Sequence, residues 1–261
     1  MIQRNYKILD QFLNERILDA HPNYVYSDEN NKQVAQMGVN RLLDYIGNGN
    51  TVLDVGCGTG RDMKYMYSQG LKPTGLNFLA SELEQITDYS GTIKLPVVCA
   101  DQSFTPFDNE HFDAVWSRHC LEHSLMPFFT LFEYNRILKT GGICYIELPA
   151  PNMEASHETN PNHYSVLDSR MWEHLFLRSG FEILSKNNID AHVVETGEEL
   201  PYSNLVEGKQ VQVGDLIDRW FVYYLRKVSK PQAGYFRDEN TRGITMSKED
   251  WEEMIQKCAH N

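Results

Sequence analysis

The chain has 261 residues, of which 41% are hydrophobic and 23% charged, a composition that suits one α/β domain with additions. Its 24 Lys and Arg against 36 Asp and Glu leave a net charge of −12, which disfavours nucleic-acid or anionic-membrane partners. No apolar run approaches the roughly 18 residues of a membrane span, and the polar N-terminus does not resemble a signal peptide.

The five cysteines, at positions 57, 99, 120, 144 and 258, include no C-x-x-C pair. This spacing predicts reduced, mostly buried thiols in a cytoplasmic protein and no cysteine-based metal site.

Two amphipathic helices are predicted before the first strand. The first covers residues 1–20, and the second carries an apolar stripe over residues 35–46. Tyr24 and Tyr26 lie in the polar break between them. We expect a helical cap over residues 1–48, which either packs on a sheet edge or covers a ligand, with the two tyrosines as lid residues.

The most informative stretch is a short apolar strand that contains an acid and ends in spaced glycines. Its residues are Val52, Leu53, Asp54, Val55, Gly56, Cys57, Gly58, Thr59 and Gly60. A strand, a glycine-rich turn and a helix in this order begin the nucleotide site of an open parallel sheet. The G-x-G-x-G spacing, with Arg61 next, differs from the dinucleotide and P-loop patterns. Asp54 would repel a pyrophosphate and suits a cationic ligand.

This stretch resembles motif I of the class I S-adenosylmethionine (SAM)-dependent methyltransferases. The resemblance implies that the loop lines the methionine part of SAM, while the acid orients the loop or receives the ammonium group through water. The residues concerned are Asp54, Gly56, Cys57, Gly58 and Gly60.

The second and third strands, predicted over residues 73–77 and 95–100, continue the resemblance. In the family the second strand ends in an acid that binds the ribose hydroxyls, whereas Asn77, followed by Phe78, stands here. An uncharged amide makes weaker hydrogen bonds than a carboxylate, so we expect ribose recognition to be weakened or rearranged. Asp101 and Gln102 follow the third strand and, by the resemblance, hold the adenine; a turn cap is the structural alternative for Asp101.

The fourth strand, residues 112–117, carries the family's F-D-x-V pattern and ends beside the transferred methyl group. The resemblance implies that Ser117 and Arg118 offer backbone groups to SAM there. The L-E-H sequence ending at His123 is similar to the small-molecule branch with the type-11 domain. A helix starting at Pro127, a glycine stop and a fifth strand over residues 142–148 follow.

The rest of the chain supplies further elements. Residues 149–165 form a polar loop with three prolines at the carboxyl end of the fifth strand, where open α/β sheets bind ligands. Asp168 is expected to cap a helix that Gly180 ends, before a sixth strand at 181–185. The last predicted elements are an insertion or hairpin at 186–215, a final antiparallel strand at 219–226 and a terminal helix after Ser247.

The predicted fold class is therefore α/β, with a Rossmann-like, seven-stranded, mostly parallel sheet, an antiparallel last strand and helices on both faces. The predicted divisions are a helical cap at 1–48, a methyltransferase domain at 49–230 and a C-terminal extension at 231–261.

Methyl transfer is an in-line displacement that needs a base only when the nucleophile carries a proton of high pKa. His119, at the end of the fourth strand, and His163, in the loop at 149–165, are the candidate catalytic residues. A hydrogen-bonded structural histidine is the alternative for His119, as it is for His123, and His157 is most simply a solvated loop residue. The histidines lack a metal-ligand spacing on an identified helix, so no metal is predicted.

The sequence thus predicts a cytoplasmic SAM-dependent methyltransferase that acts on a small molecule at oxygen. A protein or RNA methyltransferase and a SAM-binding protein without catalysis are the alternatives. Neither the acceptor nor the oligomeric state can be inferred from the sequence.

Overall fold

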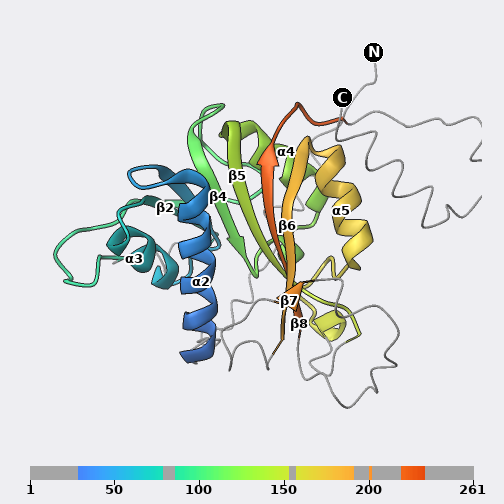
Figure 1. Cartoon of the computed structure of the whole chain (residues 1–261), viewed down its shortest axis with the longest axis horizontal. Coiled ribbons are helices and arrows are strands. Elements are labelled where there is room, and N and C mark those ends of the chain that lie inside the picture. Colours follow the sequence, from blue (N-terminus) through green and yellow to red (C-terminus); the bar gives the residue numbers. More distant parts are fainter. Residues whose placement is uncertain (1–28, 79–85, 153–156, 191–199, 202–218, 233–261) are drawn as a thin grey trace, which may run out of the picture.

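The computed structural model describes residues 29–78, 86–152, 157–190, 200–201 and 219–232 (Figure 1). The helix predicted at 1–20, Tyr24 and Tyr26, and the terminal helix lie outside the described residues. The rest forms a single sheet with helices on both faces.

The sheet has the order β3-β2-β1-β4-β5-β8-β6-β7. Its strands are β1 Thr51–Val55, β2 Lys72–Asn77, β3 Val97–Cys99, β4 Phe112–Arg118, β5 Leu138–Pro149, β6 Phe181–Asp190, β7 Leu200–Pro201 and β8 Arg219–Lys227. Strands β1 to β5 pair in parallel, and β8 inserts antiparallel between β5 and β6. The predicted seven strands and the antiparallel last strand are confirmed, and the two-residue β7 adds an eighth strand at the edge.

Two strands, β5 and β6, are markedly longer than predicted. Strand β5 begins at Leu138, four residues before the predicted start, and β6 continues to Asp190. The extension of β6 crosses polar residues that carry no strand pattern, and it is held by pairing with β8 as far as Asp190↔Arg219. Residues 186–190 therefore belong to the sheet and not to the predicted insertion.

Within the described ranges, four helices flank the sheet, together with the short 3-10 turns η2 Leu121–His123 and η3 His157–Thr159. α2 Glu29–Ile46 and α3 Arg61–Ser68 share one core with the sheet, while α4 Pro127–Ile137 and α5 Ser169–Arg178 share the other (Figure 1). Pro127 opens α4 as predicted, and the Asp168 side chain caps α5 by accepting a hydrogen bond from the Met171 amide.

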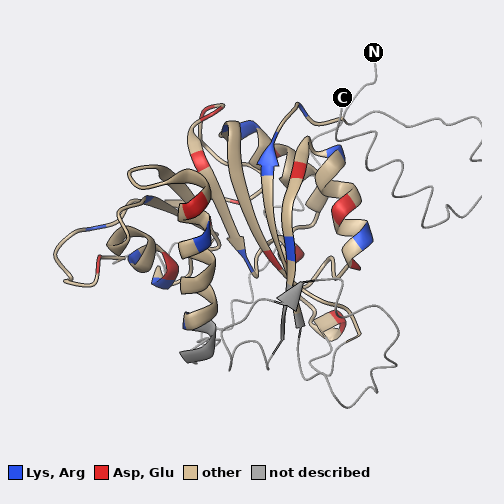
Figure 2. Ribbon diagram, in the orientation of Figure 1, with Lys and Arg blue, Asp and Glu red and all other residues tan. Residues whose placement is uncertain are grey.

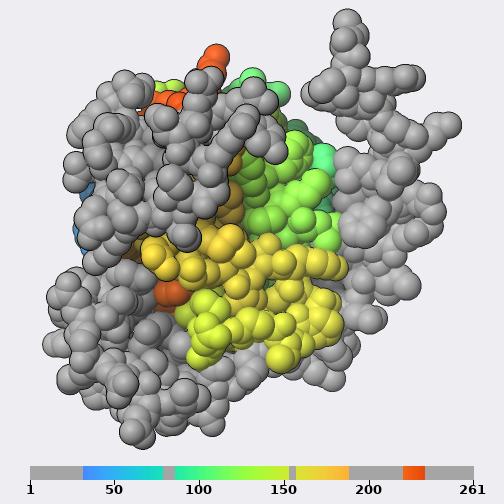
Figure 3. Space-filling view, turned by 90° about the vertical axis from the view of Figure 1, so that its right-hand side faces the viewer, coloured from blue at the N-terminus to red at the C-terminus, as the bar shows by residue number. Residues whose placement is uncertain are grey.

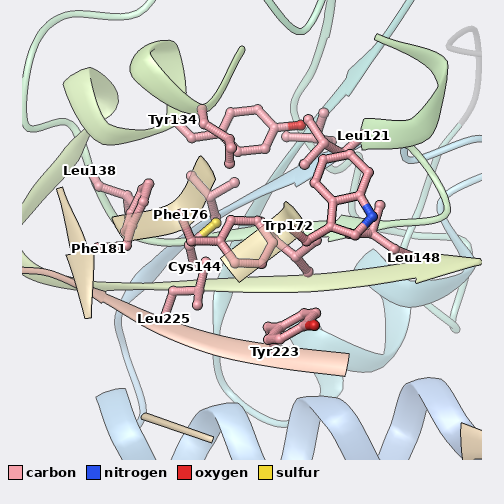
Figure 4. Packing of buried hydrophobic residues seen from close by; sticks show 14 of the residues in the cluster. Leu121, Tyr134, Leu138, Cys144, Leu148, Trp172, Phe176, Phe181, Tyr223 and Leu225 are labelled. Carbon is pink, nitrogen blue, oxygen red and sulfur yellow. The ribbon is translucent and has the colours of Figure 1, made fainter. Parts of the chain in front are cut away.

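The core on the α4–α5 face is rich in aromatic side chains (Figure 4). Trp172 and Phe176 lie four residues apart, so both point from α5 towards the sheet, where Tyr134 and Tyr223 also pack. Each large apolar side chain that is fully buried contributes roughly 1.5–3 kcal/mol. This packing anchors α4 and α5, and with them the segments that precede each helix.

Acidic and basic residues are interspersed over the described elements, and Lys and Arg do not gather along any one of these helices or strands (Figure 2). Among the described helices, none has the length and apolar composition needed to cross a membrane. Of the described cysteines, Cys57 and Cys144 are buried, Cys120 is half-buried and Cys99 is exposed, so the prediction of mostly buried thiols holds for only some of them.

Candidate active site

The carboxyl ends of the parallel strands bring the predicted site residues to one edge of the sheet. Val55, the last residue of β1, is paired with Leu76 on one side and with Ser117 on the other. The glycine turn after β1 therefore lies between the ends of β2 and β4. This edge, next to the point where the strand order reverses, is where open α/β sheets bind their ligands.

The backbone of the turn requires its glycines. Gly56, Gly58 and Gly60 have φ angles of 72°, 49° and 77°, a region that residues with a Cβ rarely adopt. A Cβ on Gly56 would lie 2.7 Å from the Cys120 sulfur, and one on Gly60 would overlap the Ile86 side chain. A Cβ on Gly58 would have no atom within 4 Å among the described residues. The middle of the turn is thus open, while both ends are packed.

The turn is fastened to β2 through the Leu76 carbonyl oxygen, which accepts hydrogen bonds from the amides of Gly56 at 2.8 Å and Cys57 at 3.1 Å. In β1, just before the turn, Asp54 is buried, and its Oδ2 has no hydrogen-bond partner within the described part of the chain. Burial, followed by the charge of Asp62, raises the pKa of Asp54 well above its ordinary value, although Arg118 acts in the opposite direction. A buried oxygen in this state is suited to receive a donor or a positive charge from a ligand.

The ends of β2 and β3 make local hydrogen bonds. Oδ1 of Asn77 accepts from the Phe78 amide at 2.7 Å, and Oδ1 of Asp101 accepts from the Ser103 amide at 2.7 Å. Asp101 therefore does cap a turn, which was its structural alternative. That bond uses one of its two carboxylate oxygens and is compatible with a second role.

Gln102 is buried and ties the third strand's end to the segment after β4. Its Nε2 donates to the Cys120 carbonyl oxygen at 2.9 Å, and its Oε1 accepts from the Tyr134 hydroxyl at 2.7 Å. The same hydroxyl lies 3.3 Å from Oγ of buried Ser117. Since these side chains are engaged internally, only the backbone groups of Gln102 and Ser117 are left for contact with a ligand.

Arg118 forms a buried ion-pair network that sequence reasoning missed. Its Nε donates to both carboxylate oxygens of Glu147 on β5, at 3.0 and 3.1 Å, and its Nη1 lies 3.7 Å from Asp62. Burial opposes the charge of Glu147, but the charges of Arg118 and His119 and hydrogen bonds outweigh it and lower the pKa of Glu147 to about 2. The sequence did offer one sign of this network, because Glu147 is an acidic residue within the otherwise apolar run at 142–148.

His119 lies between two carboxylates. Its Nε2 is 2.8 Å from Oε1 of Glu147 and its Nδ1 is 3.8 Å from Oε1 of Glu122, while the ring packs edge-on against Trp220. Burial alone would lower its pKa, but the charge of Glu147 and the proximity of both carboxylates raise it to about 9. A doubly protonated imidazole cannot accept a proton. The arrangement fits the structural alternative for His119 better than the predicted general base.

The loop after β5 docks on η2 and carries His163 to His123. The amides of Tyr164 and Ser165 donate to the Glu122 carbonyl oxygen at 2.8 and 3.2 Å, and the rings of His123 and His163 lie 4.8 Å apart. Burial lowers the pKa of His163 despite the opposing charge of Glu122. Figure 3 shows this loop and α5 as a continuous yellow band across one side of the molecule.

The profile of the family described as a methyltransferase domain matches residues 27–186, more than half of the chain. The chain belongs to the class I SAM-dependent methyltransferases. The family, the Rossmann-like fold and the enzyme class predicted from the sequence are thereby confirmed.

Curated relatives and a solved structure agree with this family. The 2-methyl-6-phytyl-1,4-hydroquinone methyltransferase of Synechocystis sp. is 26% identical over 199 residues, covering 73% of this chain and 58% of the relative. The malonyl-[acyl-carrier protein] O-methyltransferase of Salmonella typhimurium is 31% identical over 93 residues, covering 36% of each protein. The chain thus spans between about a third and three fifths of the length of these relatives.

The structure of 1,6-didemethyltoxoflavin-N1-methyltransferase from Burkholderia thailandensis, with bound 1,6-didemethyltoxoflavin and S-adenosylhomocysteine, superimposes with a TM-score of 0.53 at 17% identity. The match covers 76% of this chain and 80% of that one. At this identity the likeness supports the fold alone.

Proposed function

We propose that this chain binds SAM at the carboxyl ends of β1, β2 and β4 and transfers its methyl group to the oxygen of a small-molecule acceptor. The observation that carries the proposal is Asp54, whose buried Oδ2 lacks a partner in the described region, directly before a glycine turn that is open at Gly58. A cation with a narrow extended chain, such as the methionine part of SAM, suits both features.

Each predicted cofactor residue has a role consistent with its position. The turn from Gly56 to Gly60 would follow the methionine part, with Asp54 receiving the ammonium group directly or through water. Asn77 would bind the ribose and Asp101 the adenine amine, with the Gln102 and Phe78 backbones beside the ring. Ser117 and Arg118 would contribute backbone groups, since the Arg118 side chain is held by Glu147.

Bound SAM supplies an electrophilic methyl group on a positively charged sulfur. In methyl transfer the acceptor oxygen would form a bond to the methyl carbon as the carbon–sulfur bond breaks, and the electron pair of the carbon–sulfur bond would stay on sulfur. The acceptor's proton must leave. His163 is better suited to accept it than His119, because its Nδ1 lies 2.9 Å from the His157 carbonyl oxygen, so the neutral ring has its lone pair on Nε2.

Support for a small acceptor comes from the relative from Synechocystis sp., which is named a hydroquinone methyltransferase, and support for oxygen comes from a second relative. The relative from Salmonella typhimurium is named an O-methyltransferase, although the Burkholderia thailandensis neighbour is named an N1-methyltransferase. Acidic and basic residues are interspersed along the described elements, and this distribution does not favour an RNA substrate (Figure 2). A cytoplasmic location and the divisions at 1–48, 49–230 and 231–261 belong to the same proposal.

The cofactor assignment is tested by thermal unfolding with and without SAM or S-adenosylhomocysteine. A ligand present at about 100 times its dissociation constant stabilises the folded chain by about 2.7 kcal/mol, which raises the melting temperature. If neither compound shifts the melting temperature, the proposed function is wrong.

The variant Asp101→Ala, with exposed Asp108→Ala as its matched control, tests the adenine site. Each variant is compared with its own ligand-free melting temperature, because Asp101→Ala also loses the turn cap. We expect the SAM-induced shift to shrink strongly for Asp101→Ala and to persist for Asp108→Ala. An unchanged shift in the first variant would remove Asp101 from the site.

A further inference from the structure

Three side chains from two separate segments form a compact donor set beside the proposed methyl-transfer site. Glu122 and His123 belong to η2, after β4, and His163 belongs to the loop after β5. One ligand atom from each lies within 4.8 Å of the others, and Glu122 is buried. Two imidazoles and one carboxylate are the ligand set of many catalytic Zn²⁺ and Fe²⁺ sites.

The backbone fixes the same tautomer on both histidines. Nδ1 of His123 lies 2.9 Å from the Asn162 carbonyl oxygen, and Nδ1 of His163 lies 2.9 Å from the His157 carbonyl oxygen. Because a carbonyl oxygen only accepts, each Nδ1 must carry the hydrogen, and each neutral ring has its lone pair on Nε2. Metal-binding histidines are typically oriented by such a bond from the other ring nitrogen.

The carboxylate of Glu122 has the matching property. Its Oε2 is buried and has no hydrogen-bond partner among the residues that the structure describes, whereas Oε1 lies 3.8 Å from Nδ1 of His119. An acceptor oxygen buried without a donor is uncommon, and a cation that binds it removes the cost. His119, which lies between Glu122 and Glu147, would then orient the Glu122 carboxylate from the side away from the ion.

The loop is held where metal binding requires it. The backbone hydrogen bonds from Tyr164 and Ser165 to the Glu122 carbonyl oxygen join the two segments that carry the proposed metal ligands. These bonds do not occupy the side chains of the ligands themselves. The competing contact is Nδ2 of Asn160, which lies 3.2 Å from Nε2 of His163. Ligand atoms bound to one Zn²⁺ lie roughly 3–3.5 Å apart, so closure needs only small side-chain rotations and the release of that contact.

We propose that Glu122, His123 and His163 bind one divalent transition-metal ion at the carboxyl end of β4, and that the ion holds a hydroxyl oxygen of the methyl acceptor. The position of the acceptor rests on the proposed function; the metal site itself does not. Three protein ligands leave coordination positions open, and an oxygen bound to the ion loses its proton more readily. The acceptor class is then a hydroxylated small molecule. While the ion is bound, His163 is its ligand, so the role of His163 as proton acceptor applies only to the site without metal.

The donor set is tested by titrating the full-length, chelator-treated and tag-free chain with Co²⁺ in the absence of SAM, followed by displacement with Zn²⁺. We expect one Co²⁺ per chain, seen by visible absorption, and at least a tenfold loss of affinity in His163→Ala and in Glu122→Gln. Glu122→Gln keeps the shape of the side chain, so it separates metal binding from folding if His163→Ala is unstable.

His157→Ala is the matched control, because it removes another ring of the same loop but leaves the backbone carbonyl that holds His163. We expect it to bind Co²⁺ as the unchanged chain does. The proposal is overturned if the unchanged chain binds neither Co²⁺ nor Zn²⁺, if Glu122→Gln binds as tightly, or if His157→Ala loses binding to the same extent as His163→Ala.

Two further measurements separate this inference from the proposed function. The SAM-induced shift of the melting temperature should persist in Glu122→Gln. If the unchanged chain binds SAM but no metal, only the metal site is rejected. If it binds metal but not SAM, only the SAM site is rejected. With Mn²⁺ as the probe, enhanced water-proton relaxation is expected from open coordination positions. No enhancement with bound Mn²⁺ would contradict the role in holding the acceptor.

Discussion

The guanidinium Nε of Arg118 donates to both carboxylate oxygens of Glu147, which forms an ion pair between the neighbouring parallel strands β4 and β5. The side chain of Glu147 is fully buried, and its second oxygen also accepts a hydrogen bond from the Tyr145 hydroxyl at 2.6 Å. The pair therefore fixes the end of β4, which carries Ser117 and the start of the η2 segment.

Glu147→Gln should destabilise the fold by about 3–5 kcal/mol, because it leaves the Arg118 charge buried without its main partner. Urea unfolding gives the free energy. The control is Glu182→Gln, which breaks a half-exposed pair with Arg226 and should cost no more than about 1 kcal/mol. Similar losses in the two variants would contradict a dominant role for the buried pair. In the double variant Arg118→Met with Glu147→Leu, we expect part of the loss to be recovered.

The same carboxylate makes stability depend on pH in the acid range. The pKa of Glu147 is lowered to about 2 in the folded chain. Its contribution is fully present above the ordinary glutamate pKa of about 4.3 and is lost as pH falls towards 2, with a size on the order of 3 kcal/mol. The unfolding free energies of the unchanged chain and of Glu147→Gln should therefore converge as the pH falls from about 4 to about 2, the range between the ordinary pKa of glutamate and the lowered pKa of Glu147. A constant difference would show that Glu147 does not titrate as described.

Gly58→Ala separates backbone strain from ligand contact. Gly58 and Gly91 both have positive φ, and a Cβ at either position has no atom within 4 Å in the described chain. Alanine should cost roughly 1–2 kcal/mol at each position because of the left-handed backbone. Only Gly58→Ala should also weaken SAM binding, measured by calorimetry. Equal SAM affinities in the two variants would place the ligand away from Gly58.

Asn77→Asp tests the ribose position. The substitution keeps the oxygen that accepts from the Phe78 amide and adds a negative charge. Since charge-assisted hydrogen bonds are roughly twice as strong as neutral ones, we expect SAM to bind several-fold more tightly. The matched control is Asn109→Asp, which makes the same amide-to-carboxylate change at an exposed position. We expect it to leave the SAM affinity unchanged.

Local sequence was sufficient for much of the fold. The strand at β1, the glycine turn and Pro127 at the start of α4 follow from backbone conformation and short-range periodicity, which depend on neighbouring residues only. The start of β5 and the end of β6 did not follow from the sequence. Leu138 enters the sheet by pairing with Phe112 of β4, and polar residues such as Lys186 and Asn187 enter it by pairing with β8 and β7.

The candidate site divides in the same way. The sequence by itself determined the family, the glycine turn and the acids at the strand ends, since each depends on residues a few positions apart. Only the tertiary structure decided that Glu147 engages Arg118 and His119, and that His163 meets Glu122 and His123 across about forty residues of chain. Those relationships depend on which strands become neighbours and on how a long loop folds back, and no local pattern encodes either.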